Sequence, residues 1–377
     1  MTVSACGTGQ AKPTATTSAT ASPSVSASSL FVIATGLPPP QLVNAPLVSP
    51  ATVEIIDSEA RVHASASFQP PPAPKIGNAA ALLQSPVRTA AGSAYFADSA
   101  GVVRKLTPDG SVSVVATFPL TNSQQELTYA VSPDGAHLIA IVLSTPPLHS
   151  PPPQSLSDPL FVEGGHWMLD VETADPGGRT TITLHRDLGS VYPQPTLIVG
   201  WDAKGPLATL NSGLGAQAPP LSAHFFGQDL GGAPLIHLSS DGTHLDRIGG
   251  SDCLAVDEIA DGTVVCGSYD SQQFSVRNST GATLWQATLP SDVGDEGPWL
   301  SPDGNAIAVR GFVLTPGRVA SAPRLNGASQ PELFALGWLD TNTVVEATLS
   351  AQLSLYNAHG LTLVRELGAS GIFEGVL

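Results

Sequence analysis

The chain has 377 residues, a formal net charge of −16 and only 12% charged residues. This acidic excess, with only four lysines, disfavours electrostatic binding to nucleic acid or anionic lipid and favours a cation, a basic small molecule or a basic protein surface as the partner. No run of 18 or more apolar residues occurs, so no membrane-spanning helix is expected. With 42% hydrophobic residues, 37 glycines and 34 prolines, the chain can bury a large core and form many turns.

The N-terminal segment differs in composition from the rest of the chain. Residues 14–29 are almost entirely Ser, Thr, Ala and Pro, so residues 1–29 are predicted to be a disordered tether. Just before this tract, Val3, Ser4, Ala5 and Cys6 resemble the lipobox of bacterial lipoproteins. The resemblance implies that Cys6 is lipidated and that the protein is anchored outside the cell membrane or secreted. The family pattern also includes basic and apolar stretches upstream, whereas only five residues precede Cys6, and a chance cysteine in a disordered tail is the alternative.

Residues 30–377 are predicted to form one all-β domain. Residues 106–115, 131–142 and 300–310 repeat a pattern in which an apolar strand end meets Pro-Asp-Gly and a second apolar strand follows. Pro ends the first strand, and Asp-Gly provides the positive φ that a tight hairpin turn requires. A repeat of short strands and tight turns is typical of a β-propeller.

The strand pattern divides most naturally into seven four-stranded blades. Six or eight blades also fit, because blade six is poorly defined beyond Arg310. Two apolar segments are left over, residues 30–35 at the front and residues 371–377 at the back. We expect both to join one blade, with the C-terminal segment as its inner strand, because this closes the ring and removes an open sheet edge. The predicted ranges are 80–118 for blade two, 127–188 for three, 195–248 for four, 253–289 for five, from 299 for six and 332–367 for seven.

These repeats resemble the WD40-like and TolB-type β-propellers of bacteria, in which a Ser-Pro-Asp-Gly turn joins the first two strands of a blade. The resemblance extends in pattern over residues 30–377, and two turns match it strictly. It implies a propeller fold and a function in surface recognition. Other propellers with the same outline are enzymes, so the fold alone does not decide the chemistry.

Strand alternation sorts the connections onto two faces of the disc. The tight Asp-Gly turns join strands a to b or c to d and lie on one face, whereas the long connections 36–51, 144–159 and 211–233 lie on the other. Long connections often carry function, so we expect the ligand to bind on the long-loop face. The candidate ligand-binding residues are His224, Phe225 and Phe226 in one loop and Asp292, Asp295 and Glu296 in another. The alternative for the first group is a lid packed on the disc, and the alternative for the second is an ordinary solvated loop.

No strong catalytic motif occurs in the chain. There is no Gly-x-Ser-x-Gly elbow, His-Glu-x-x-His pair or Walker loop, and His237 and His244 lack a third ligand nearby in sequence. We therefore expect a non-catalytic, monomeric binding protein without cofactor or metal, whose ligand is a protein, peptide or glycan. It would not bind nucleic acid, and would meet the membrane only through a lipid anchor. The alternatives are a lyase or hydrolase with its site at the central channel, and an envelope scaffold of the TolB type.

Cys253 and Cys266 lie on opposite sides of one predicted turn and are expected to form a disulfide in an oxidising compartment. A two-residue Asp-Gly turn would place Cys253 opposite Asp270, so the bridge requires a loop centred nearer Ile259. Two buried free thiols are the alternative.

Overall fold

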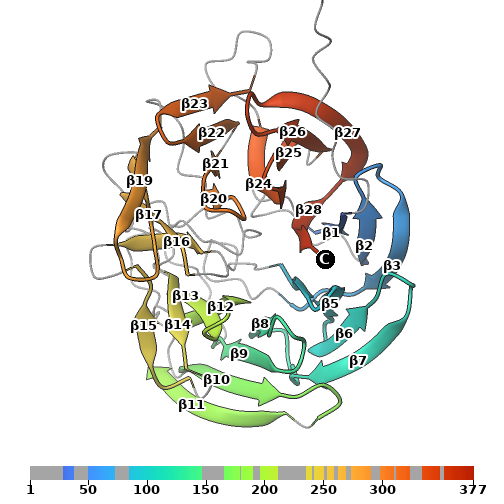
Figure 1. Ribbon diagram of the computed structural model, residues 1–377. Coiled ribbons are helices and arrows are strands. Elements are labelled where there is room, and N and C mark those ends of the chain that lie inside the picture. The colour runs from blue at the N-terminus through green and yellow to red at the C-terminus, as the bar shows by residue number, and fades with distance from the viewer. Residues whose placement is uncertain are drawn as a thin grey trace, which may run out of the picture.

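Seven antiparallel sheets form a ring in the computed structural model (Figure 1). The structure describes residues 29–37, 50–72, 85–146, 165–178, 180–189, 196–210, 235–239, 242–249, 253–258, 262–268, 273–289, 298–309, 311–322, 333–348 and 352–377. These residues form 28 strands, four in each sheet, and contain no helix that could cross a membrane. The prediction of an all-β propeller with seven four-stranded blades is therefore confirmed, and the counts of six and eight are wrong.

Blade one joins the two ends of the domain, as the sequence predicted. The C-terminal strand pairs with the first strand, so that Phe31 lies opposite Val376 and Ala34 opposite Ile372. The rings of Phe31 and Phe373 lie 5.8 Å apart, within a cluster that packs blade one on blade seven. From the centre outward, the strands of blade one are β28 (Ile372–Val376), β1 (Leu30–Thr35), β2 (Ala51–Asp57) and β3 (Val62–Phe68).

The other six blades follow chain order, and the first strand of each lies nearest the centre (Figure 1). Blade two consists of β4 (Val87–Ala90), β5 (Ser93–Ala97), β6 (Val102–Leu106) and β7 (Val112–Thr117). Blade three consists of β8 (Gln125–Val131), β9 (Leu138–Ser144), β10 (Trp167–Ala174) and β11 (Thr181–Gly189). Blade four consists of β12 (Thr196–Trp201), β13 (Pro206–Leu210), β14 (Leu235–Leu238) and β15 (Leu245–Arg247). Blade five consists of β16 (Leu254–Glu258), β17 (Val264–Ser268), β18 (Gln273–Arg277) and β19 (Thr283–Thr288). Blade six consists of β20 (Trp299–Leu300), β21 (Ile307–Val309), β22 (Phe312–Thr315) and β23 (Arg318–Ser321). Blade seven consists of β24 (Leu333–Asp340), β25 (Thr343–Thr348), β26 (Gln352–Asn357) and β27 (Thr362–Ser370).

Burial decreases from the inner strands to the outer strands, and the strand sequences become more polar in the same direction. Strand β9 is buried almost throughout because both of its faces pack against neighbouring blades, which explains its continuous apolar run. The outermost strand β11 is mostly exposed and carries His, Arg and Asp. The apolar side chains therefore form clusters between successive blades rather than one central core.

The Ser-Pro-Asp-Gly turns are held by their own side chains. In blade six the hydroxyl of Ser301 donates to Asp303 Oδ1 (2.7 Å) and accepts from the amide of Ala306 (2.9 Å). Gly304 adopts a φ of +71°, which an L side chain rarely adopts. The turn at residues 132–137 in blade three makes the equivalent bonds, so the repeated motif is a repeated turn structure.

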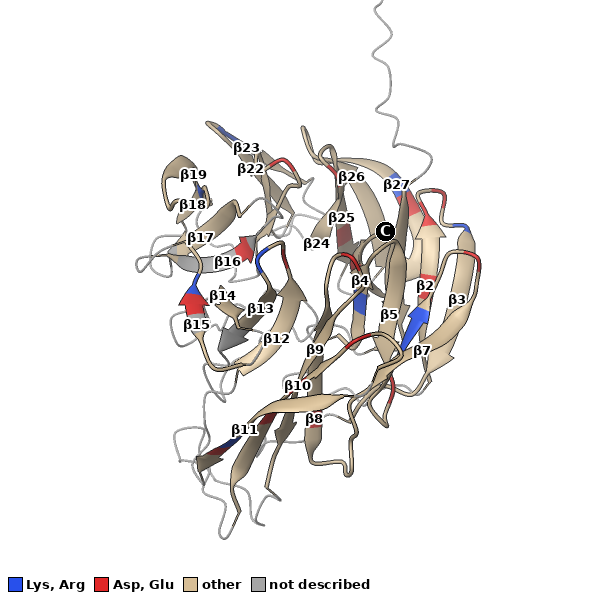
Figure 2. Ribbon diagram, turned by 60° about the horizontal axis from the view of Figure 1, so that its bottom comes forward, with Lys and Arg blue, Asp and Glu red and all other residues tan. Residues whose placement is uncertain are grey.

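Acidic and amide side chains hold most of the other short connections in the same way. In each, a side-chain oxygen accepts the amide two residues further along, as in an Asx turn. Figure 2 shows red acidic segments at several of these turns. Part of the acidic excess therefore has a structural role. The residues are Asp57, Asp98, Asp109, Asp202, Asn278, Asp340 and Asn357.

Hydrogen bonds between inner strands link successive blades. Ile198 N donates to Thr128 Oγ1 (3.0 Å), which joins blade four to blade three. The indole of Trp299 donates to Ala335 O (2.9 Å), which joins blade six to blade seven. These bonds fix the spacing of the strands around the channel.

Candidate functional site

The candidate residues on the long-loop face lie outside the described part of the chain. This holds for His224, Phe225, Phe226, Asp292, Asp295 and Glu296, and also for the proposed lipidation site Cys6. The described strands nevertheless show between which strands the long connections run, and the second of them extends further than the expected 144–159, because β10 begins only at Trp167. Those between β1 and β2, β9 and β10, and β13 and β14 all join the second and third strands of a blade, and therefore open on one face. We call this the long-loop face, and the opposite one, with the Asp-Gly turns, the tight-turn face.

The inner strands of blades one to three bring four polar side chains together. On β4, Arg88 donates from Nε to Tyr129 O (3.0 Å) and from Nη1 to Ser85 O (2.7 Å). Its guanidinium lies 5.7 Å from the centroid of the Tyr129 ring. The Ser85 hydroxyl donates to the carboxyl of Glu374 on β28. The group therefore links three blades and places a cation and a carboxyl group near the channel.

Burial controls the ionisation of this group. It raises the pKa of Glu374 to about 8, against the opposing effects of the Ser85 hydrogen bond and the Arg88 charge. It also lowers the pKa of Arg88 and raises that of the Tyr129 hydroxyl. Burial thus favours the neutral form of Glu374, whereas an arginine keeps its charge.

A cavity of about 310 Å³ opens where the inner strands of blades one to four end, on the tight-turn face. It is lined by Arg88 and Ala90 of β4, by Ala130 and Val131 of β8, and by Trp201 of β12, together with the turns after β4 and β8 and the end of β28. Trp201 is half-buried and packs against the apolar cluster between blades three and four. The cavity is mostly apolar, and Arg88 and Trp201 are among the residues that line it.

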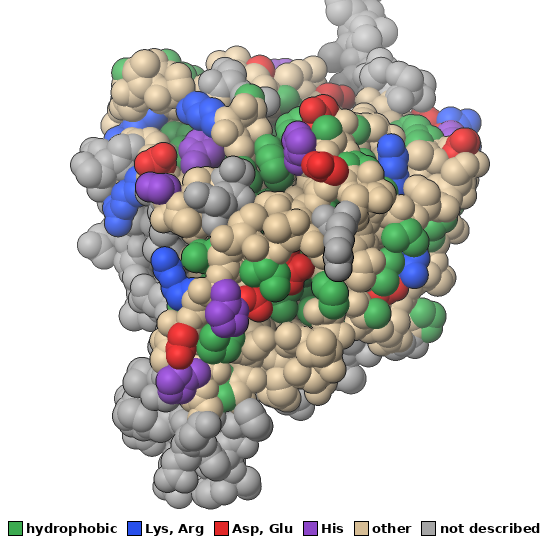
Figure 3. Space-filling model, turned by 90° about the horizontal axis from the view of Figure 1, so that it is seen from below, with side chains coloured by type: hydrophobic (Ala, Val, Ile, Leu, Met, Phe, Trp, Pro, Cys, Tyr) green, Lys and Arg blue, Asp and Glu red, His purple; other side chains and the backbone are tan. Residues whose placement is uncertain are grey.

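Among the described residues, five histidines each bond to an aspartate, and these five pairs lie at turns or away from the inner strands. The best buried is His237 on β14, whose Nε2 lies 2.8 Å from Asp202 Oδ2. Burial raises the pKa of Asp202, but hydrogen bonds from His237 and two amides hold it below its usual range. Within the described ranges, no group of three or more His, Cys, Asp or Glu could hold a metal ion. Figure 3 shows histidine and acidic side chains side by side at several places on one side of the ring. The pairs are His63–Asp57, His137–Asp175, His166–Asp187, His185–Asp170 and His237–Asp202.

Two further carboxyl groups are buried between blades. Glu346 on β25 is fully buried, and neither of its carboxyl oxygens has a hydrogen-bond partner among the described residues. Glu126 on β8 is also buried, and its Oε1 has no partner in the same part of the chain. Burial raises the pKa of each to about 8, so both are protonated at neutral pH.

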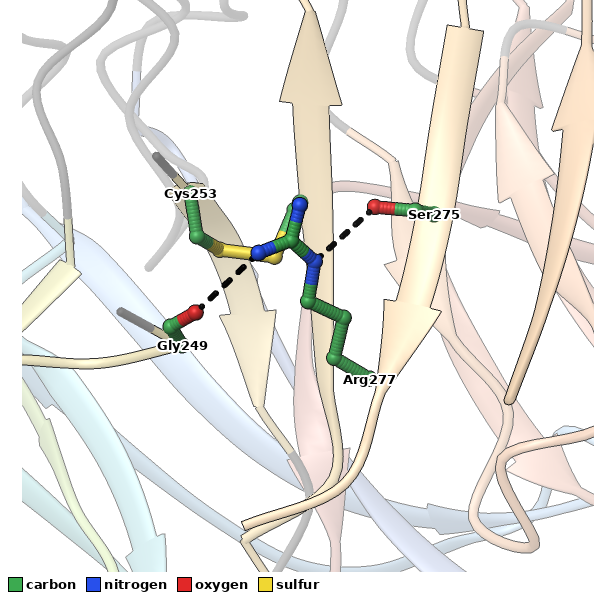
Figure 4. Close-up of a disulfide and its surroundings, with 5 residues drawn as sticks. Gly249, Cys253, Ser275 and Arg277 are labelled. Carbon is green, nitrogen blue, oxygen red and sulfur yellow. Dashed lines mark hydrogen bonds between the residues drawn. A yellow bond between two sulfur atoms is a disulfide. The ribbon is translucent and has the colours of Figure 1, made fainter. Parts of the chain in front are cut away.

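The structure brings Cys253 and Cys266 to bonding distance, with sulfurs 1.94 Å and Cα atoms 5.1 Å apart (Figure 4). The expected loop centred nearer Ile259 is not how this happens. Instead, the pairing of β16 with β17 shifts between Ala255 and Asp257, so that Ala255 lies opposite Cys266. This bulge adds one residue to β16 and places the two cysteines diagonally. Their oxidised state in the cell remains a prediction.

Sequence reasoning did not find the cavity or the polar group beside it. Arg88, Trp201 and Glu374 come from three blades that are far apart in sequence, and none belongs to a motif. The sequence contained one signal, the position of Arg88 in a short inner strand. Arginine is uncommon at such positions unless it has a partner, so its presence there points to a specific role.

Comparisons with known proteins give similarity of fold alone. No family model matches the chain, and no curated protein matches its sequence. Among solved structures, an oligogalacturonate lyase from Vibrio parahaemolyticus is 11% identical over 79% of this chain and 80% of that chain, with a TM-score of 0.45. A protein from Lactobacillus plantarum is 13% identical over 92% of this chain and 98% of that chain (TM-score 0.45). Dipeptidyl peptidase 4 of Porphyromonas gingivalis is 10% identical over 86% of this chain and 49% of that chain (TM-score 0.44). At these values no residue or activity is carried over.

Proposed function

We propose that this chain is a non-catalytic β-propeller that acts outside the cytoplasm and binds a protein, peptide or glycan through its long-loop face. The main support is the contrast between the two faces. On the tight-turn face, side chains such as Ser132, Asp134 and Asp303 bond within their own turns, so they have few groups left to contact a partner. The connections on the other face are far longer than reversing a strand requires.

The net charge of −16 favours a partner with a basic surface. Asp292, Asp295 and Glu296 would provide charge complementarity, and Phe225 and Phe226 an apolar contact. In this proposal the protein works as a monomer, and neither a metal nor a cofactor takes part.

The test uses the full chain on arrays of glycans and of basic peptides. Replacing Phe225 and Phe226 by Ala, or Asp292, Asp295 and Glu296 by their amides, should weaken any binding that is found, and surface plasmon resonance would measure the loss. The control is Asp134→Ala on the tight-turn face, which should leave binding intact in the folded protein. Loss of binding in this control, with a normal circular dichroism spectrum, would show that the other face is the working one.

Location outside the cytoplasm rests on Cys6 and on the Cys253–Cys266 pair. Disulfides persist in oxidising compartments, and two cysteines at bonding distance fit such a site of action. Cys6→Ser should move the protein from the membrane fraction to the soluble exported fraction. If the unaltered protein fractionates with the cytoplasm, this part of the proposal fails.

A further inference from the structure

We propose that one face of the two outer strands of blade three binds an extended basic segment of a partner protein. These strands, β10 and β11, lie at the rim of the ring (Figure 1). The rim is a separate surface from the long-loop face, so binding there goes beyond the function proposed above. The carboxyl groups of this face are regularly spaced, and one of them is buried without a partner among the described residues.

Three cross-strand pairs place three acidic side chains on this face. Residues two apart on a strand point to the same side, and residues directly opposite each other on neighbouring strands share a face. Strand β10 pairs with β9 without a shift in register, so the alternation along β10 is regular. We call the surface that the three pairs form the acidic face of blade three. The pairs are Met168–Asp187, Asp170–His185 and Glu172–Ile182.

The acidic face contains no lysine or arginine. Arg186 of β11 lies opposite Leu169 and therefore projects from the other side of the sheet. Asp170 and Asp187 bond to histidines. Histidine, unlike lysine and arginine, is not a permanent cation at neutral pH. The face thus presents negative charge that a basic partner can neutralise.

Glu172 is the residue of this face that most needs a cation. It is only 6% exposed, and it forms no hydrogen bond or ion pair in the part of the chain that the structure describes. Burial and the neighbouring charge of Asp170 both raise the pKa of Glu172. An ammonium or guanidinium group beside the two carboxyl groups would oppose both effects and supply the missing hydrogen-bond donors.

The spacing of the carboxyl groups indicates an extended segment with basic residues at every second position. Asp170 and Glu172 are two residues apart on β10, and an extended chain repeats its side chains on one side at this same interval, about 6.6 Å. Lysine and arginine are long enough to bring a charge to a buried carboxyl group while their stems cover apolar surface. Ile182, which is 58% exposed, offers such a surface directly opposite Glu172.

The position of β11 also suits an extended partner. It is the outermost strand of its sheet, so the edge of β11 has no neighbouring strand within the blade, and a segment can lie along it. The net charge of −16 attracts a basic segment and favours its encounter with this surface.

The test compares two basic peptides of identical composition on the full chain. In one peptide lysine and threonine alternate, and in the other the lysines form one block. Fluorescence anisotropy should show that the alternating peptide binds about tenfold more tightly. The double variant Asp170→Asn with Glu172→Gln should abolish this preference. The matched control is Asp292→Asn with Asp295→Asn, which changes the net charge equally and should leave the preference intact.

Four outcomes would overturn the proposal. Equal binding of the two peptides, or an equal loss in both double variants, would show attraction by net charge alone. A loss in the Asp292 and Asp295 variant only would place the peptide on the long-loop face. Displacement of the peptide by butylamine at low millimolar concentration would show a site for a small cation.

The variants can be checked for folding by their melting curves. Glu172→Gln replaces a buried ionisable group by a neutral one of the same shape, so this variant should fold. If the double variant is unstable, Glu172→Gln alone should reduce the preference for the alternating peptide. An unchanged preference in this folded variant would contradict the role of Glu172.

Discussion

One carboxylate, Asp57, holds the whole turn between β2 and β3. Its Oδ1 accepts the amides of Glu59 (2.9 Å) and Arg61 (3.0 Å), and its Oδ2 lies 2.7 Å from Arg61 Nε and 2.9 Å from His63 Nε2. Burial opposes ionisation of Asp57, but these hydrogen bonds hold its pKa well below its usual range. The side chain is only 2% exposed, so a replacement cannot be solvated easily.

Asp57→Ala should therefore destabilise the protein by about 2 kcal/mol, because several donors lose a charged acceptor. Asp57→Asn keeps one acceptor oxygen and should cost less. Urea unfolding followed by circular dichroism would measure both. Glu59→Ala, two residues away, is the control and should change little, and an equal loss in the control would remove the special role of Asp57.

The Cys253–Cys266 pair gives a second prediction at the residue scale. The cysteines are separated by 13 residues, and closing a loop of this size stabilises a fold by about 3 kcal/mol through the unfolded chain. Protein exported from the cytoplasm should show neither of these thiols as free when titrated under denaturing, non-reducing conditions. Reduction should then lower the midpoint of unfolding. Two titratable thiols would refute the bridge.

At the scale of elements, the strand β28 closes the ring. Ile372 and Phe373 are buried, and β28 pairs with β1, so its loss would expose the edge of β1 and part of two apolar clusters. Deletion of residues 371–377 should lower the free energy of unfolding by several kilocalories per mole. A melting curve identical to that of the full chain would contradict the role of β28. The control is Leu363→Ser on β27, an exposed position where little change is expected.

The elements also show which parts of the structure can be predicted from sequence. The Ser-Pro-Asp-Gly turns could be predicted because their bonds lie within six residues, and the closure could be predicted because two apolar segments lacked partners. The pairing of β16 with β17 could not, since a bulge between Ala255 and Asp257 depends on how the blade packs. The cavity depends on four blades at once, and no local pattern records where Arg88 and Trp201 meet.

At the scale of the whole molecule, three carboxyl groups set the response of stability to rising pH, two of them buried (Glu126 and Glu346) and one half-buried (Glu374). Glu126, Glu346 and Glu374 have pKa values raised by burial to about 8. The folded state thus holds protons that the unfolded chain, with glutamate pKa values of about 4.3, releases. Stability should therefore fall as pH rises from about 4.5 to 8, and should not fall further through these groups above that range.

Turn aspartates act in the opposite direction at acidic pH. The pKa values of Asp57, Asp202 and Asp303 are lowered, for Asp303 against burial and through hydrogen bonds from Asn305 and Ser301. The stabilisation that these aspartates give is fully present above their pKa in the unfolded chain, about 3.9, and is lost as pH falls through their pKa values in the folded state. The two sets of groups together predict greatest stability near pH 4.5, which thermal unfolding across pH 3 to 9 would locate.

Glu346 gives this pH response a direct test. Both of its carboxyl oxygens are buried without partners among the described residues, so its ionisation costs more than that of a hydrogen-bonded group. Glu346→Gln cannot ionise, so its melting temperature relative to the unaltered protein should rise steadily between pH 5 and pH 8. Glu366→Gln on β27 is the matched control, and this exposed position should give a constant difference across the same range. If the melting temperatures of the two variants respond to pH in parallel, Glu346 is not a source of the loss of stability between pH 5 and pH 8.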